Sequence, residues 1–183
     1  MPLIYRGEGN AGCWAVWKIT ESEAELWKEA KLSSEEATRV RRIVHERRRL
    51  ESLAARAARA RLNPFPHFSL SHSNPWAAAA TSPHPIAIDI ERLRPFPPAV
   101  WHYFTQESER QREDPPSFTK WHFWCAKELS YKLLCQEFDK ISFRRELSVW
   151  KDRVEFRRGE IYREIALFFV ETQDWLLAVG WLK

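Results

Sequence analysis

Apolar and polar positions alternate in short runs along most of the chain, and between these runs they recur at helical spacing. Strands are predicted at residues 13–19, 67–71, 76–81, 86–91, 148–156, 164–170 and 175–181. Helices are predicted at residues 21–31, 47–62, 99–104, 105–112 and 117–136, and a further helix is predicted to open with Glu35 and Glu36. A strand, then helices, then strands occur twice in this order. The order predicts an α+β fold of two lobes, residues 1–85 and 86–183, which meet near Pro83–Ile86.

Length and composition agree with this fold class. The chain has 183 residues, of which 44% are hydrophobic and 30% charged, a profile typical of one compact domain or two small lobes. It has no apolar run of about 18 residues, so we expect no membrane helix, and its opening residues lack the apolar core of a signal peptide. Three cysteines without a C-x-x-C pair argue against a disulfide framework or zinc site and predict a cytoplasmic protein.

The charge of the chain is concentrated in one predicted helix. The net charge is +4, and residues 39–61 alone contain nine arginines against two glutamates. Arg42, Arg49 and Arg56 recur every seven residues and would share one face of a continuous helix. A face of guanidinium groups suits a polyphosphate ligand, although a solvated basic face or a nucleic-acid surface would explain the same pattern.

A second candidate for chemistry is the strand at residues 86–91. Its three isoleucines point to one side, whereas Ala87, Asp89 and Glu91 point to the other. Two carboxylates on one side of a strand lie roughly 7 Å apart and repel each other unless a cation or a basic residue lies between them. A hard cation such as Mg²⁺ takes ligands of this kind, but two solvated acids at the end of a strand are the simpler explanation of this segment taken alone.

The predicted helix around Trp124 carries charges within an apolar stripe. Trp121, Cys125, Glu128, Lys132 and Cys135 fall on one narrow face. A Glu–Lys pair four residues apart is favourable on a helix surface. Its place on the apolar face is not explained in that way, because buried charges are costly unless they are paired or bind a ligand.

The segment Phe68–Ser73 is a further candidate for a binding site. There a predicted strand leads into a turn that carries two hydroxyls and an imidazole. Ser71, His72 and Ser73 could bind an anion there through side-chain and backbone donors. A turn capped locally by its own polar side chains is the common alternative.

Taken together, these segments resemble one known family. The run HFSLSHSNPWAAAATSPHPIAIDIE, followed by WCAKELSYK at residues 124–132, resembles the 4′-phosphopantetheinyl transferase superfamily, in particular its single-chain, two-lobed branch. The family is marked by a serine–histidine–serine turn, a G-x-D-x-E strand and a W-x-x-K-E-x-x-x-K helix. These motifs match Ser71–Ser73, Ala87–Glu91 and Trp124–Lys132, and weaker similarity extends to Leu32–Glu36 and Phe104–Glu107.

The resemblance implies a fold and a reaction. The fold is two similar α+β lobes packed as a pseudo-dimer, and the chain is expected to be a monomer. The reaction is transfer of the 4′-phosphopantetheine arm of coenzyme A to a serine of an apo carrier protein, with release of adenosine 3′,5′-bisphosphate. Neither a nucleic acid nor a membrane is an expected partner.

The resemblance also implies residue roles. Asp89, Glu91 and Glu128 would bind Mg²⁺ together with the coenzyme A diphosphate, and Lys132 would contact the phosphate that is transferred. Glu128 is also a candidate base for the carrier serine. The residues expected to contact the nucleotide and phosphates of coenzyme A are His72, Ser71, Arg49 and Arg56.

Two departures from the family pattern keep an alternative open. Ala87 stands where the family has glycine, and residues 133–141 lack the glycines that often follow the last motif. A degenerate member that binds coenzyme A or a carrier protein without catalysis is therefore a second hypothesis. A nucleic-acid module and another metal-dependent phosphotransferase are further alternatives, but the first leaves the acidic residues unexplained.

Overall fold

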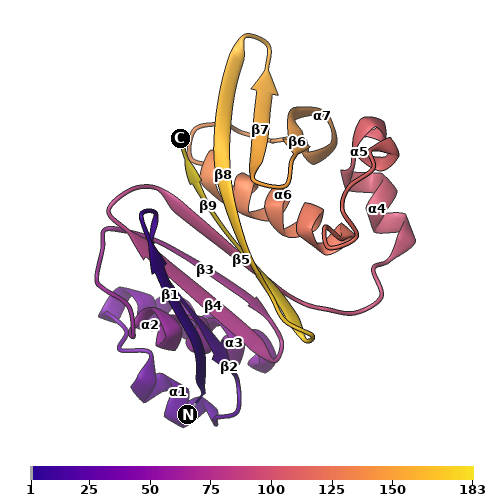
Figure 1. Cartoon of the computed structure of the whole chain (residues 1–183). Helices are drawn as coiled ribbons and strands as arrows, with labels where there is room; N and C mark the ends of the chain where they lie inside the picture. The colour runs from indigo at the N-terminus through magenta and orange to yellow at the C-terminus, as the bar shows by residue number, and fades with distance from the viewer. Residues whose placement is uncertain (1) are drawn as a thin grey trace.

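Two antiparallel sheets form the frame of the chain in a computed structural model that describes residues 2–183. The first sheet has the order β1-β2-β4-β3, with β1 (Leu3–Gly9), β2 (Gly12–Lys18), β3 (His67–Ser73) and β4 (Trp76–Ser82). The second has the order β5-β9-β8-β7-β6, with β5 (Ile86–Arg92), β6 (Leu147–Val149), β7 (Arg153–Arg158), β8 (Ile161–Glu171) and β9 (Trp175–Leu182). All strands of the first sheet precede those of the second along the chain (Figure 1).

Three helices cover the outer face of the first sheet: α1 (Glu23–Glu29), α2 (Ser34–Arg41) and α3 (Glu46–Arg59). Ser22 and Ser33 begin α1 and α2 through capping boxes with a glutamate three residues later. The alanines of α3 pack in one buried cluster with Ala77 and Ala79 of β4. Small side chains on both elements let the helix lie close to the sheet.

Four helices lie beside the second sheet: α4 (Pro98–Phe104), α5 (Glu107–Gln111), α6 (Lys120–Leu134) and α7 (Phe143–Glu146). The longest, α6, packs its apolar residues against β5, β9 and the strands beyond them. At Gly180 of β9 a Cβ atom would lie 2.4 Å from Leu129 Cδ1 and 3.2 Å from the Ala166 carbonyl oxygen. Gly180 therefore leaves room for Leu129 of α6 on the sheet.

A third apolar cluster joins the two sheets. The isoleucines of β5 and apolar residues of β9 meet the faces of β2 and β4 that turn away from α1–α3, including Trp14, Val16 and Ala78. The resulting order is helices, sheet, sheet, helices (Figure 1). Because both faces of β4 are covered, all seven of its residues are buried, which explains its run of alanines.

The α+β fold class predicted from the sequence is confirmed, while several element boundaries were wrong. The sequence pattern missed β1 and α7, and the strand predicted at residues 148–156 is interrupted, because β6 and β7 are separate strands. Ser71–Ser73 belong to the end of β3 and do not form a turn. Within residues 2–183, no helix has the length and apolar character needed to cross a membrane.

Candidate functional site

The candidate site lies where the edge of the second sheet meets α6, and Asp89 of β5 is at its centre. Its carboxylate is on the face of β5 opposite the isoleucines, as the alternation predicted, and the residue is only 5% exposed. Oδ1 accepts hydrogen bonds from Ser71 Oγ and Lys132 Nζ, both at 2.8 Å. Oδ2 is buried and has no hydrogen-bond partner among the described residues. A buried carboxylate oxygen without a partner is costly, so this atom fits a bound cation.

Glu91 continues the acidic face two residues further along β5. Its Oε2 accepts a hydrogen bond from Ser73 Oγ at 2.7 Å, and its Oε1 accepts one from Trp124 Nε1 at 3.0 Å. Burial, and then the negative charge of Asp89, raise the pKa of the Glu91 carboxyl. The first residue of the W-x-x-K-E motif thus holds an acid of the G-x-D-x-E strand.

Glu128 of α6 is the third acid, and it is half-buried. Burial raises the pKa of its carboxyl, and the charges of Asp89 and Glu91 raise it further. Glu128 also lines an open cavity of about 1380 Å³ together with Trp124, Tyr103 and Phe143. Of the three acids, Glu128 alone lines this cavity. It is therefore the acid that a substrate entering the cavity would meet first.

The three acids suit Mg²⁺ in chemical kind, although their side chains do not form a ready-made cage. Within residues 2–183, no group of three His, Cys, Asp or Glu side chains is arranged to hold a metal ion by itself. The ammonium group of Lys132 instead lies at Asp89, and its Nζ also donates to the Ile88 carbonyl at 2.8 Å. The negative charge of Asp89 raises the pKa of both Glu91 and Glu128, and a divalent cation between these carboxylates would offset that repulsion.

His72 lies at the border of this acidic group and points to α3. Its Nδ1 is 3.1 Å from Glu51 Oε2, and the charges of Lys132, Arg48 and Asp89 also act on the ring. Burial is the main cause that lowers the pKa of His72. Arg48 is an exposed residue of α3 whose charge acts on His72, and the heptad spacing in the sequence did not single it out.

Arg49 and Arg56, the other two residues predicted to bind coenzyme A, are engaged elsewhere. Arg49 donates to both carboxylate oxygens of Glu23, at 2.7 and 2.8 Å. Arg56 donates to Ser52 and lies 3.7 Å from a carboxylate oxygen of Glu36. Both therefore join α3 to the helices beside it, and the structure does not bring them to Asp89 as it brings His72.

Comparison with known proteins adds to this geometry. No family model matches the chain. It is 35% identical over 78 residues to the 4′-phosphopantetheinyl transferase psf-1 of Bacillus pumilus, an alignment that covers 38% of this chain and 32% of the relative. A 4′-phosphopantetheinyl transferase of Bacillus subtilis is 36% identical over 70 residues, or 36% of this chain and 31% of the relative. The 4′-phosphopantetheinyl transferase gsp of Aneurinibacillus migulanus is 33% identical over 75 residues, with 37% and 31% covered.

Four curated 4′-phosphopantetheinyl transferases match this chain at 30–36% identity, and the matches support the superfamily that the sequence motifs resemble. The matches cover about a third of the length of these relatives. The α+β fold with two antiparallel sheets is consistent with this similarity.

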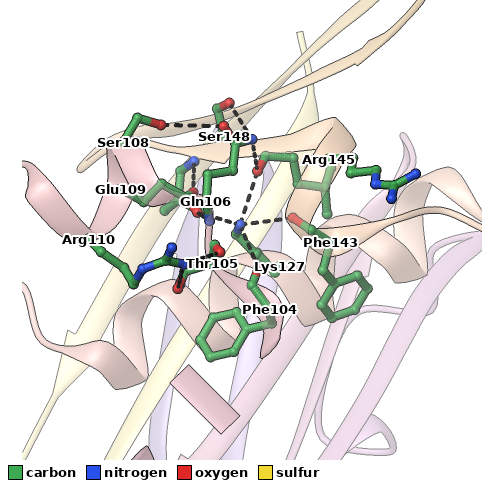
Figure 2. Close-up of polar contacts among 12 residues, drawn as sticks. Phe104, Thr105, Gln106, Ser108, Glu109, Arg110, Lys127, Phe143, Arg145 and Ser148 are labelled. Carbon is green, nitrogen blue, oxygen red and sulfur yellow. Dashed lines mark hydrogen bonds and ion pairs between the residues drawn. The ribbon is translucent and has the colours of Figure 1, made fainter. Parts of the chain in front are cut away.

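The superfamily's W-x-x-K-E motif contains a buried lysine whose importance the sequence pattern did not reveal. Lys127 is 0% exposed and donates to Glu109 Oε2 at 2.7 Å and to the carbonyls of Phe104, Phe143 and Leu147 (Figure 2). These partners come from α4, α5, α7 and β6. The fully buried charge of α6 is thus Lys127, whereas Glu128 and Lys132 are partly exposed.

Ala87, which stands where the superfamily motif has glycine, is packed in the buried core. Ala87 is 1% exposed and packs in the cluster beneath α6. The residue paired with it on β9 is Gly180, which leaves room for Leu129 of α6. A glycine therefore stands beside position 87, on the neighbouring strand.

Proposed function

We propose that this chain transfers 4′-phosphopantetheine from coenzyme A to a serine of an apo acyl or peptidyl carrier protein and releases adenosine 3′,5′-bisphosphate. The observation that carries the proposal is the convergence of Asp89, Glu91, Glu128 and Lys132 at one edge of the second sheet. These four residues fall in two of the three motifs that mark the superfamily. The names of the relatives support the same activity.

The acids would bind Mg²⁺ together with the coenzyme A diphosphate. Asp89 would contribute Oδ2, the buried oxygen without a partner, and Glu91 and Glu128 would complete the set. The ion would supply charge neutralisation at the diphosphate. Lys132 is 29% exposed at its side chain, so its ammonium can turn from Asp89 to the phosphate that is transferred.

In the proposed reaction the serine oxygen attacks the phosphorus that carries the pantetheine arm. A new P–O bond forms to the serine, and the bond from this phosphorus to the oxygen of adenosine 3′,5′-bisphosphate breaks. Glu128 takes the serine proton, because it is the acid that lines the cavity open to a second substrate. Lys132 stabilises the negative charge on the phosphate oxygens.

For the nucleotide half of coenzyme A we propose His72 together with Arg48. The charges of Asp89 and Lys132 act on His72, and the charge of Arg48 acts on the same ring, whereas Arg49 and Arg56 would have to leave Glu23 and Glu36 to reach the site. Ser71 is 7% exposed and bonded to Asp89, so a direct contact with coenzyme A is the weaker of its two roles.

The expected partner is an acidic carrier protein, which the net charge of +4 favours. We expect a cytoplasmic monomer that acts on no nucleic acid and no membrane. The ion pairs of Arg49, Arg59 and Arg61 with helix glutamates reduce the number of guanidinium groups that α3 and its C-terminal end could offer to a nucleic acid.

Intact-mass measurement of apo carrier proteins tests the proposal. The carriers are incubated with the protein, coenzyme A and Mg²⁺, and a parallel reaction contains a chelator. A phosphopantetheine mass gain that the chelator prevents is the expected result. Coenzyme A binding without transfer to any carrier would favour the degenerate binder, and the absence of both would contradict the proposal.

A further inference from the structure

Serine side chains of β3 in the first sheet are hydrogen-bonded to the backbone of β5 in the second, beside the apolar cluster through which the two sheets pack. β3 is an edge strand of the first sheet and β5 an edge strand of the second. The hydroxyls of Ser69, Ser71 and Ser73 accept hydrogen bonds from the backbone N–H groups of Ile88, Ile90 and Arg92, at 3.2, 3.3 and 3.1 Å. These serines satisfy donors of an edge that would otherwise be unpaired.

Two of the three serines make a second contact. Ser71 donates to Asp89 and Ser73 donates to Glu91, each to the residue just before the one whose N–H it accepts. In the same register Ser69 would meet residue 87, which is an alanine and offers no acceptor. A hydroxyl has one proton, so a serine that accepts from the backbone and donates to a carboxylate has a fixed orientation.

We infer that Ser71 and Ser73 are positioning residues, with which the first sheet orients the metal-binding acids of the second. The inference rests on the proposed function. Ser71, together with Lys132, occupies Asp89 Oδ1 and leaves Oδ2 free for a cation. Ser73 of β3 and Trp124 of α6 each donate a hydrogen bond to a different oxygen of Glu91. The carboxylate is therefore held by one group from the first sheet and one from the helix on the second sheet. Partners of this kind orient metal ligands in other proteins and act on metal affinity through them.

Ser69 provides a matched control, because it makes the same seam contact and touches no carboxylate. The probe is Mn²⁺ alone, titrated into the intact protein without coenzyme A and followed by electron paramagnetic resonance of the free ion. Ser71→Ala and Ser73→Ala are expected to weaken Mn²⁺ binding by about 10- to 100-fold. Ser69→Ala is expected to leave the affinity unchanged. Urea unfolding of each variant is measured in parallel, because all three lose one seam hydrogen bond.

Ser73→Thr, which keeps the hydroxyl, should retain the wild-type affinity for Mn²⁺. Wild-type affinity in Ser71→Ala and Ser73→Ala would overturn the inference, and so would an equal loss in Ser69→Ala, which would indicate a general effect of the seam. Weakened coenzyme A binding with unchanged Mn²⁺ binding would assign the serines to the nucleotide instead. If the wild-type protein binds no Mn²⁺ alone, the titration is repeated with coenzyme A present, and absence of Mn²⁺ binding there as well would overturn the proposed metal site, and the inference with it.

Discussion

At the scale of single residues, the three carboxylates of the site differ in the hydrogen-bond donors that contact their oxygens. Asp89 has two donors on one oxygen and none on the other, whereas Glu91 has one donor on each. Glu128 faces the cavity. The three acids therefore differ in role although they are the same chemical group.

Asp89→Ala should abolish carrier modification, with a loss of turnover of at least about 100-fold, because the central acid of the proposed metal site is gone. It should also lower the free energy of unfolding by about 1–3 kcal/mol, since Ser71 loses its acceptor. The mass assay and urea unfolding measure these two effects separately. Asp89→Asn, which keeps the shape and removes the charge, is the control. Near-normal turnover in either variant would contradict the assignment of Asp89.

At the scale of elements, α6 combines catalytic candidates with the residues that hold it in place. Glu128 and Lys132 lie on the side of α6 that faces the site. Lys127 binds groups of α5, α7 and β6, and the His122 side chain accepts a hydrogen bond at the N-terminal end of the helix. The position of the proposed catalytic groups thus depends on contacts on the other sides of the same helix.

Lys127→Met should destabilise the protein by about 3–5 kcal/mol, because it leaves Glu109 buried without its cation. Burial already lowers the pKa of Lys127, as expected for a desolvated ammonium group. Removing both charges in Lys127→Met with Glu109→Gln should recover part of this loss. Urea unfolding of the two single variants and the double variant measures the coupling. Additive losses would show that the pair does not act as a unit.

His122 predicts a pH dependence of stability. Burial lowers its pKa from 6.5 to about 4, and the Thr119 backbone N–H donates to its Nδ1, which only an unprotonated nitrogen can accept. Phe118 and Phe169 pack against the ring, and Glu171 is 3.7 Å from Nε2. In the unfolded state His122 therefore binds a proton near pH 6.5, whereas in the folded state it binds this proton only near pH 4.

The stability that neutral His122 contributes is complete above pH 6.5 and is lost as the pH falls from 6.5 toward 4. His122→Gln, which does not titrate, should lose less stability over this range than the wild type. Urea unfolding at pH 7.5, 6 and 5 compares the two proteins. Identical pH profiles would mean that His122 takes up its proton at the same pH in the folded and unfolded states, which would contradict the lowered pKa.

At the scale of the whole molecule, the site depends on the junction of the two sheets. The apolar cluster between them contains residues of β2, β4, β5 and β9, and the serines of β3 reach the acids of β5. Neither sheet by itself would cover the isoleucine face of β5 or satisfy its edge.

Residues 1–84 and 85–183, expressed separately, should each be poorly soluble, because each exposes its half of this apolar cluster. Expressed together, the halves should associate and co-purify. Solubility and size-exclusion chromatography provide the measurement. A soluble, monomeric and folded 85–183 fragment would show that the second half is stable without the first.

The sequence alone determined the chemistry that is local. The alternation in β5 separated the isoleucines from Asp89 and Glu91, and the order of elements predicted an α+β fold. The spacing of apolar and charged residues was sufficient for these predictions, because a strand or helix is determined largely by residues a few positions apart.

Only the tertiary structure decided which groups meet. Helical spacing placed Glu128 and Lys132 on one apolar face, but the buried charge of α6 is Lys127, since its partners lie 16 to 23 residues away in the chain. Heptad spacing selected Arg49 and Arg56, which bind acids of α1 and α2 instead. Ser71 and Ser73 each reach a carboxylate 18 residues along the chain because two sheet edges lie side by side. Contacts of this kind are set by how the sheets and helices pack, and no local pattern in the sequence encodes them.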